Sequence, residues 1–372
     1  MKPTSSSYSD ETNSWMAGIQ FMRFVAALMV TIYHANIWVN NAFPRSENDP
    51  IMLFSMIGAA GVPVFFTISG FVICFNSWSL FQKNAAVIGF LTRRFLRIYP
   101  IYWIAMLLYL IGRQWRPDPG ALGLDQLLFA ALLLPSYAKL VISPAWTLLY
   151  EVYFYLLFGL SLWLPRRIAL TAISGFFLFC VFTGRALNFP DMNAVLETMT
   201  NPVLLEFLAG LLLATIARQQ VWAEKIFRRP VIWLLLGGSL VGFAAIPLLR
   251  PYHLPAVILL GLPSVMIVWW SVAAEFSQSL PRFMRRVAPL GDSSYSLYLI
   301  HQLVMSQLAP LAAWFAAHGF ATPLVLLVAY TVAAVITGLG FHYWIENPLL
   351  RLLKKKRPPV ARTSPMGDPG QP

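Results

Sequence analysis

Long apolar stretches alternate with short polar segments along most of this chain. Ten of the stretches are close to the roughly 20 residues that a helix needs to cross a bilayer. They lie at residues 16–39, 51–78, 98–115, 142–164, 168–183, 202–217, 231–249, 254–274, 294–316 and 323–345. The pattern therefore predicts an all-α integral membrane protein, built as a bundle of about ten transmembrane helices.

An eleventh apolar stretch, residues 122–134, is shorter and contains Asp125. Lys and Arg decide whether it crosses the membrane, because they are enriched in cytoplasmic loops. With ten spans and a cytoplasmic N-terminus, 20 of the 27 Lys and Arg residues lie inside, 6 lie outside, and Arg23 lies within the membrane. An eleventh span would leave 8 inside and 18 outside. We therefore expect ten spans, both termini in the cytoplasm, and a short non-spanning outer helix near residues 122–134.

Composition supports a membrane protein and argues against a nucleic-acid partner. Hydrophobic residues make up 58% of the chain, charged residues only 11%, and the mean hydropathy is +0.65. A soluble domain has about 25% charged residues, so lipid must be the solvent here. The net charge of +12 comes from short runs between apolar stretches. We expect a cytoplasmic tail at residues 1–15, a membrane domain at 16–350, and a basic, disordered cytoplasmic tail at 351–372.

The cysteines and histidines do not predict a metal site. Cys74 and Cys180 lie inside apolar stretches, so we interpret them as small buried hydrophobic residues rather than a disulfide or a nucleophile. The five histidines are scattered, without the spacing of metal ligands. We therefore expect no metal and no tightly bound cofactor.

Arg23 and His34 lie in the first predicted span. Eleven residues return a helix to within about 20° of the same face, about 16 Å further along the axis. Charged and ionisable residues inside a span are costly and mark functional sites. The alternative is that His34 only hydrogen-bonds to another helix while Arg23 extends toward the membrane surface.

Two arginines, Arg94 and Arg97, precede the third predicted span in the segment RRFLRIYP. They are three residues apart and share a helical face. Paired guanidinium groups at the cytoplasmic boundary suit an anionic phosphate group. The alternative is an ordinary topological anchor that contacts lipid headgroups.

Further polar residues fall within the spans. Ser69 follows Gly61 and Pro63 in the second span, where it can bond backbone groups that a loosened helix leaves free.

In the fourth span, Thr147, Glu151 and Tyr155 share one face, and Glu151 is a candidate acid, base or partner of a histidine. The remaining candidates are the aromatic residues Trp146 and Tyr150, which could stack on a sugar, together with Glu206, Tyr295, Tyr298 and His301.

Together these motifs resemble acyltransferase family 3, a family of ten-span membrane acyltransferases. The matching features are R-x10-H at Arg23 and His34, FFxxSGF around Ser69, RxxRIxPxY at Arg94, WTLxxE ending at Glu151, SYxxYLxH ending at His301, and a closing IExP. They occur in family order between Phe21 and Leu353. One departure is Thr147, where the family often has Ser.

The resemblance implies roles for single residues. His34 would be the essential catalytic histidine, with Arg23 as its motif partner, and Arg94 and Arg97 would serve an acyl-CoA donor, which we expect to be acetyl-CoA, from the cytoplasm. Family members acylate lipopolysaccharide sugars, glycan polymers, lipo-oligosaccharide signals and macrolides. Some carry a C-terminal SGNH hydrolase-like domain, which we do not expect here, so the transfer that this domain assists would occur without it or with a separate partner.

We therefore expect an enzyme of a bacterial inner (plasma) membrane that transfers an acyl group to a hydroxyl of a carbohydrate or glycolipid. Glu151 would orient His34 or stabilise its imidazolium. The alternative from another class is a transporter or flippase, in which the intramembrane ionisable residues form a path for protons or substrate. It lacks support from repeated halves with matching broken helices. A membrane sensor is a third possibility, without an appended domain to support it.

Overall fold

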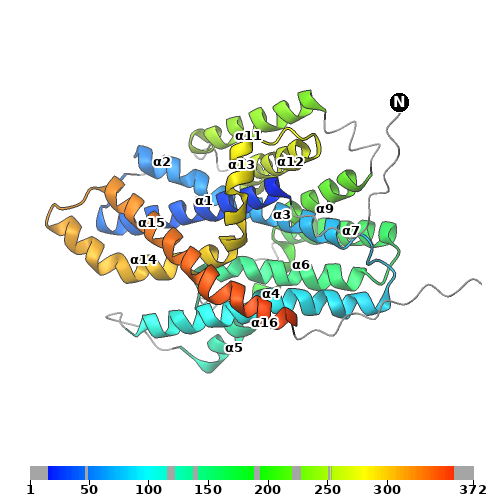
Figure 1. Cartoon of the computed structure of the whole chain (residues 1–372), viewed down its shortest axis with the longest axis horizontal. Helices are drawn as coiled ribbons and strands as arrows, with labels where there is room; N and C mark the ends of the chain where they lie inside the picture. Colours follow the sequence, from blue (N-terminus) through cyan, green and yellow to red (C-terminus); the bar gives the residue numbers. More distant parts are fainter. Residues whose placement is uncertain are drawn as a thin grey trace, which may run out of the picture.

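The computed structural model describes residues 16–46, 49–114, 122–136, 141–187, 193–219, 228–249, 252 and 254–355. All regular structure within these ranges is helical, and most of the long helices run side by side in one bundle (Figure 1). The α-helices are α1 (Ala17–Ala42), α2 (Pro50–Met56), α3 (Gly61–Asn76), α4 (Asn84–Arg113), α5 (Leu124–Leu132), α6 (Trp146–Ser161), α7 (Arg166–Ala186), α8 (Ala194–Thr200), α9 (Leu204–Arg218), α11 (Arg229–Leu249), α12 (Leu262–Phe276), α13 (Arg282–Val287), α14 (Ser294–Ala317), α15 (Pro323–Phe341) and α16 (Asn347–Lys355). Short 3-10 or π turns join some of them: η1 (Ile57–Ala60), η2 (Ser143–Ala145), η5 (Val257–Gly261), η6 (Ala288–Ser293) and η7 (His342–Glu346).

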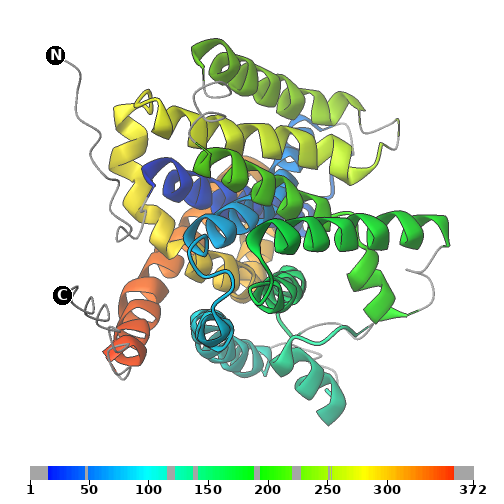
Figure 2. The same ribbon diagram turned by 90° about the vertical axis from the view of Figure 1, so that its right-hand side faces the viewer.

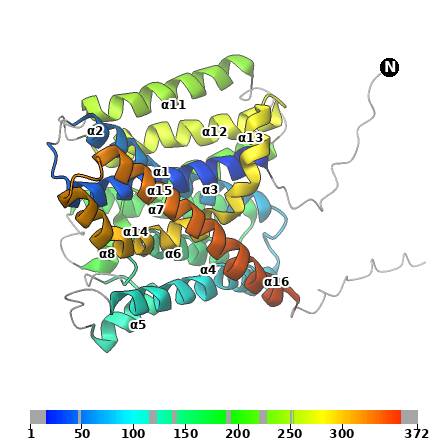
Figure 3. The ribbon, with the colours of Figure 1, turned by 60° about the vertical axis from the view of Figure 1, so that its left-hand side comes forward.

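Nine helical segments in the described part of the chain are long and apolar enough to cross a membrane. Each overlaps one predicted span, and the remaining predicted span, residues 142–164, forms the 16-residue helix α6 beside α4 and α7. The predicted all-α membrane bundle is therefore confirmed. The first residues of α1 and the last residues of α16 lie at the same end of the bundle (Figure 3). Which side of the membrane this end faces stays a prediction.

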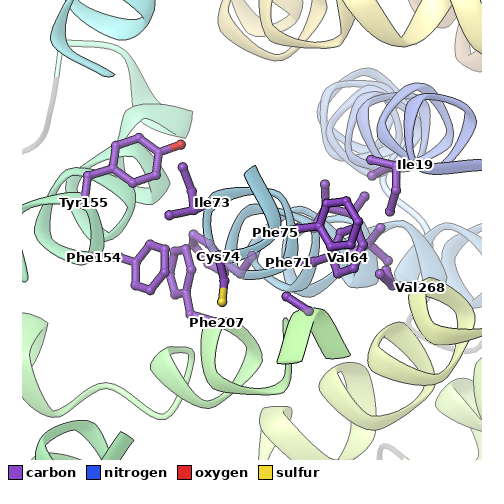
Figure 4. Close-up of a cluster of buried hydrophobic side chains, with 14 of the residues drawn as sticks. Ile19, Val64, Phe71, Ile73, Cys74, Phe75, Phe154, Tyr155, Phe207 and Val268 are labelled. Atoms are coloured by element: carbon purple, nitrogen blue, oxygen red, sulfur yellow. The ribbon is translucent and has the colours of Figure 1, made fainter. Parts of the chain in front are cut away.

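Helix α3 lies at the centre of the bundle, with α1, α6, α9 and α12 packed around it (Figure 2). Its apolar side chains point in several directions, as expected for a helix buried all round. Figure 4 shows Phe71 and Phe75 of α3 facing Ile19 and Val268 on one side. On another side, the ring of Phe154 on α6 stacks on that of Phe207 on α9, at 4.4 Å between centroids.

Helices α3 and α9 approach each other through two glycines. A Cβ atom at Gly70 would collide with the backbone carbonyl of Phe207, and one at Gly210 would collide with that of Thr67. Small residues let helix backbones come into van der Waals contact in membranes, where lipid offers no hydrophobic force to drive association. This contact fixes α3, which forms one wall of both cavities described below.

Helix α4 extends beyond the predicted third span. That span was predicted to begin at residue 98, with Arg94 and Arg97 on one helical face at its cytoplasmic end, and α4 begins at Asn84 and has 30 residues. The arginines at 93, 94 and 97 therefore belong to the same continuous helix as the span. The side chains of Arg94 and Arg97 face a polar cavity, where their charge is tolerated within the bundle.

The short stretch between the third and fourth predicted spans forms α5, which has nine residues and is too short to cross a bilayer. Three aromatic side chains of α4 donate hydrogen bonds to backbone carbonyls at its C-terminal end. Tyr99 Oη bonds to Leu132 O at 3.0 Å, Tyr102 Oη to Ala130 O at 2.7 Å, and Trp103 Nε1 to Ala131 O at 2.9 Å. These bonds satisfy carbonyls that the end of a helix leaves unpaired.

The C-terminal prediction is partly wrong. Residues 351–355 were expected in a disordered tail, but they are helical, because η7 continues α15 directly into α16. Leu349 in α16 packs on the apolar core, which gives this extension a buried contact. The rest of the predicted tail and the predicted tail at 1–15 lie outside the described residues. Cys74 and Cys180 are buried and free, as predicted.

Candidate active site

A polar cavity of about 480 Å³ opens between α1, α3, α4, α6 and the start of α14. It lies toward the end of the bundle at which α1 begins, since Met16 and Gln20 border it. We call it the arginine cavity, because Arg23, Arg94 and Arg97 all line it. The predicted face shared by the last two residues therefore exists, and it points at this cavity.

The two arginines of α4 have different surroundings. Arg94 stacks over the rings of Phe90 and Tyr155, at 5.3 and 5.5 Å from their centroids. Its Nε atom is buried and has no hydrogen-bond partner among the described residues. Arg97 instead makes an ion pair with Glu346, at 3.2 Å between Nη1 and Oε1. Arg94 is therefore the better placed of the two to bind an anion, and Arg97 is already partly neutralised.

Glu346 is a site residue that the sequence analysis did not single out. Its side chain is 0% exposed. It accepts a hydrogen bond from Ser296 Oγ at 2.6 Å and lies 2.9 Å from His342 Nδ1. It belongs to η7, a π-helical turn of the kind that often occurs at functional sites. The sequence did contain a signal for this residue, because Glu346 is the carboxylate of the closing IExP motif. We had interpreted that motif only as the end of the last span.

The predicted face of α6 borders the same region. Glu151 accepts hydrogen bonds from Tyr155 Oη and from Ser69 Oγ, the latter at 3.2 Å. Thr147 Oγ1 lies 2.8 Å from Tyr298 Oη. Glu151 thus joins α6 to α3, and Thr147 joins α6 to α14.

A second, smaller cavity of about 90 Å³ adjoins the arginine cavity. The two share a ring of lining residues, which we call the junction: Arg23, Ile68, Ser69, Glu151 and Tyr295. Arg23 Nη1 bonds Gln20 Oε1 at 3.0 Å on the arginine-cavity side. Beyond the junction, the smaller cavity is bordered mainly by apolar side chains, and Tyr298 is also part of its lining.

His34 and His301 form a hydrogen-bonded pair, which we call the histidine pair. His34 Nδ1 lies 3.0 Å from His301 Nε2, and the ring centroids are 5.0 Å apart. His301 is fully buried, whereas His34 is partly exposed. The ring of Tyr298 lies 5.9 Å from that of His301, so the pair adjoins the far end of the smaller cavity.

The hydrogen-bond partners assign the protons of this pair. His301 Nδ1 faces the carbonyl oxygen of Leu297 at 3.2 Å, so it carries a proton and leaves Nε2 as an acceptor. His34 Nδ1 faces two acceptors at 3.0 Å, this Nε2 and the carbonyl oxygen of Val30, so it also carries a proton. His34 Nε2 is left with a free lone pair, which can accept a proton from a substrate.

The structure gives His34 a different partner from the one expected. Glu151 was expected to orient it, but the carboxylate of Glu151 is bonded to Ser69 and Tyr155. His301 occupies the orienting position instead.

Besides His34 and His301, three predicted site residues line neither cavity. Trp146 is exposed and its ring packs on that of Tyr150. Tyr150 Oη accepts a hydrogen bond from Asn201 Nδ2 at 3.1 Å, toward α8 and α9. Glu206 is buried beside Gly261 of η5, and its Oε2 has no hydrogen-bond partner in the described chain.

Comparison with known sequences adds a family. The sequence model of acyltransferase family 3, described as an acyltransferase domain, matches residues 16–343. This range includes every residue of the junction and the histidine pair. Glu346 lies just beyond it.

Three relatives are similar over most of their length. ExoZ, an exopolysaccharide production protein of Rhizobium meliloti, is 32% identical over 310 residues, which cover 81% of this chain and 92% of that protein. The acyltransferase MdmB of Streptomyces mycarofaciens is 28% identical over 386 residues, 93% of this chain and 95% of that protein. Nodulation protein 10 of Rhizobium leguminosarum bv. viciae is 24% identical, covering 83% and 87%. No solved structure matches.

Proposed function

Because the chain belongs to acyltransferase family 3 and is a membrane acyltransferase, we propose that it moves an acyl group from acyl-CoA to a hydroxyl of a carbohydrate or glycolipid acceptor. We take acetyl-CoA as the donor. The observation that carries the proposal is an arginine-lined cavity that shares the junction with a smaller cavity, whose lining residue Tyr298 packs beside a pair of histidines with an available lone pair. An anion site and a base on either side of the smaller cavity suit transfer between two substrates that enter separately.

The arginine cavity suits the nucleotide end of the donor. Guanidinium groups bind phosphates through parallel charge-assisted hydrogen bonds, and Arg94 stacks on two rings that hold its plane fixed. A cavity of about 480 Å³ lies within the size range of small-molecule sites. Under the predicted topology this cavity faces the cytoplasm, where acyl-CoA is available.

His34 is suited to act as the general base. Its Nε2 accepts the proton of the acceptor hydroxyl as that oxygen attacks the thioester carbon, and the carbon–sulfur bond then breaks. The proton passes to the departing sulfur, so that acyl-CoA and a hydroxyl become an ester and free CoA. His301 holds the ring of His34 through Nδ1 and shares the positive charge that develops on it. A base of this kind contributes a factor of about 10²–10⁴ in rate.

The acceptor class rests on the relatives. One of them is named for exopolysaccharide production and another for nodulation, while a third is named an acyltransferase. We infer from the first that this chain modifies a surface carbohydrate or its lipid-linked precursor. The enzyme would lie in the inner membrane of a bacterium, with His34 toward the outer side.

Mass spectrometry of surface glycans from cells with and without this protein tests the proposal. Cells that have the protein should carry an acyl ester, an acetyl group in the simplest case, that cells without it lack. Membranes supplied with acetyl-CoA labelled in the acetyl group should transfer the label to the same glycan. Unchanged glycans together with no transfer of label would contradict the proposal.

Arg94→Ala should raise the KM for acyl-CoA by about 10- to 100-fold, because a hydrogen bond to a charged group contributes about 1.5–3 kcal/mol. Arg94→Lys should restore little of this loss, since a point charge does not reproduce the planar fork. The matched control is Arg286→Ala on α13, an exposed arginine that does not line the cavity. If Arg94→Ala and Arg286→Ala have the same KM, Arg94 does not bind the donor.

A further inference from the structure

The smaller cavity has no role yet in the mechanism. Three helices lead into it from the junction. Along α3, Phe66, Phe65 and Val62 precede Ser69 and lie up to about 10 Å deeper by helix rise. Leu148 lies deeper than Glu151 on α6, in the same direction. The cavity is therefore a pocket with a polar mouth and largely apolar walls.

Its size limits what it can hold. An engineered cavity of about 150 Å³ holds a benzene molecule, which has six carbon atoms. A cavity of about 90 Å³ then has room for three or four non-hydrogen atoms. An acetyl group has three such atoms and a propionyl group has four, whereas a hexanoyl group has seven.

A polar side chain at this pocket has no partner. Ser294 is 0% exposed and lines the smaller cavity but not the arginine cavity. Its Oγ has no hydrogen-bond partner among the described residues. A buried hydroxyl without a partner is costly, which indicates that a ligand supplies the missing acceptor. The carbonyl oxygen of an acyl thioester is such an acceptor.

We propose that the smaller cavity is the acyl pocket of the enzyme, that its apolar walls restrict the donor to acyl groups of two or three carbons, and that Ser294 donates a hydrogen bond to the acyl carbonyl. The inference rests on the proposed function, because it takes acyl-CoA as the donor. It adds the chain length that the enzyme accepts and a residue that contacts the reacting carbonyl.

Phe65 is the side chain that sets the limit. It lines the pocket beyond the junction, and its ring packs edge-to-face on Tyr298 at 5.6 Å. It is only partly buried, unlike Phe66, which packs on Phe207 in the core. Shortening Phe65 therefore enlarges the pocket toward Tyr298 with less damage to the core.

Competition binding to the purified full-length protein tests the pocket without an acceptor. Coenzyme A and its acetyl, propionyl, butyryl and hexanoyl thioesters compete with labelled acetyl-CoA. For the unaltered protein, acetyl-CoA and propionyl-CoA should bind alike, because both acyl groups fit the pocket volume. Hexanoyl-CoA should bind at least about tenfold more weakly, since one methylene that a pocket cannot accommodate changes recognition by about 10–200-fold. In Phe65→Ala, and to a smaller extent in Phe65→Leu, this difference should shrink severalfold.

Two matched controls accompany these variants. Phe182→Ala removes a ring of α7 that is 68% exposed, and should leave the chain-length profile unchanged. Ser294→Ala should weaken acetyl-CoA about tenfold while leaving coenzyme A unchanged, because coenzyme A lacks the acyl carbonyl. Ser293→Ala alters the neighbouring serine, whose Oγ bonds Leu290 O at 2.7 Å, and should not discriminate between the two ligands.

The possible outcomes separate the two proposals. If neither coenzyme A nor any thioester competes and the protein binds no labelled acetyl-CoA, the proposed donor is wrong. If all the thioesters bind equally well to the unaltered protein, the donor stands and the acyl pocket is wrong. If the chain-length limit is present but unchanged in both Phe65 variants, or if Ser294→Ala weakens coenzyme A as much as acetyl-CoA, the assignment to these residues fails.

Discussion

Replacing His34 by alanine should lower the rate of acyl transfer by about 10²–10⁴, which is the usual contribution of a general base. The reason is the lone pair of His34 Nε2, which accepts the proton in the proposed mechanism and which alanine lacks. Transfer is measured with labelled acetyl-CoA in membranes that contain equal amounts of each variant. Binding of acetyl-CoA should be unchanged, since His34 lines neither cavity.

His318→Ala is the matched control for this variant. His318 follows α14, is exposed, and contacts only neighbouring groups such as the carbonyl oxygen of Trp314, at 2.8 Å from Nδ1. Replacing His318 should leave the rate of acyl transfer within about twofold of normal, because surface substitutions that touch neither the core nor a buried polar network have small effects. Full activity in a well-expressed His34→Ala protein would end this mechanism and make His301 the candidate base.

Replacing Arg97 by glutamine should destabilise the protein much more than replacing Arg94. Loss of Arg97 leaves the carboxylate of Glu346, which is 0% exposed, without its cationic partner. Breaking a buried ion pair from one side costs about 3–5 kcal/mol. Arg97 itself is partly exposed to the cavity, so we expect the lower end, about 3 kcal/mol, measured by thermal unfolding of the purified protein.

A second substitution tells this effect from a general disturbance of α4. Glu346→Gln added to Arg97→Gln removes the stranded charge and should return most of the lost stability. For comparison, Arg285→Gln breaks the partly exposed ion pair with Glu275 and should cost about 0–1 kcal/mol. If Arg97→Gln costs no more than Arg285→Gln, the buried pair does not stabilise the fold.

Hydropathy alone could predict the membrane bundle, because a span must be apolar over about 20 residues wherever it lies in the fold. Helical periodicity also placed Glu151 and Tyr155 on one face, and they are bonded as neighbours four residues apart. Hydropathy and helical periodicity both depend only on residues that are close in sequence, so they can be read without knowing how the helices pack.

Pairs between distant helices could not be predicted in this way. His34 and His301 are 267 residues apart in sequence, and periodicity says which face each occupies but not which faces meet. The same applies to Arg97 and Glu346. Without knowledge of these partners, the sequence left open whether the arginines of α4 bind an anion or only anchor the helix at the membrane boundary. Glu151 was assigned to His34 because depth along a helix was the only available guide.

The contact of Gly70 with Gly210 restricts how this enzyme can diversify. No residue with a side chain fits at either position without moving α3, which carries Ser69 and Phe65. Substitutions that reshape the donor side must therefore preserve the close packing of α3 on α9. The loop between α14 and α15 is exposed and does not take part in this packing. Natural variation among related enzymes should accordingly be tolerated in this exposed loop long before it is tolerated around the donor.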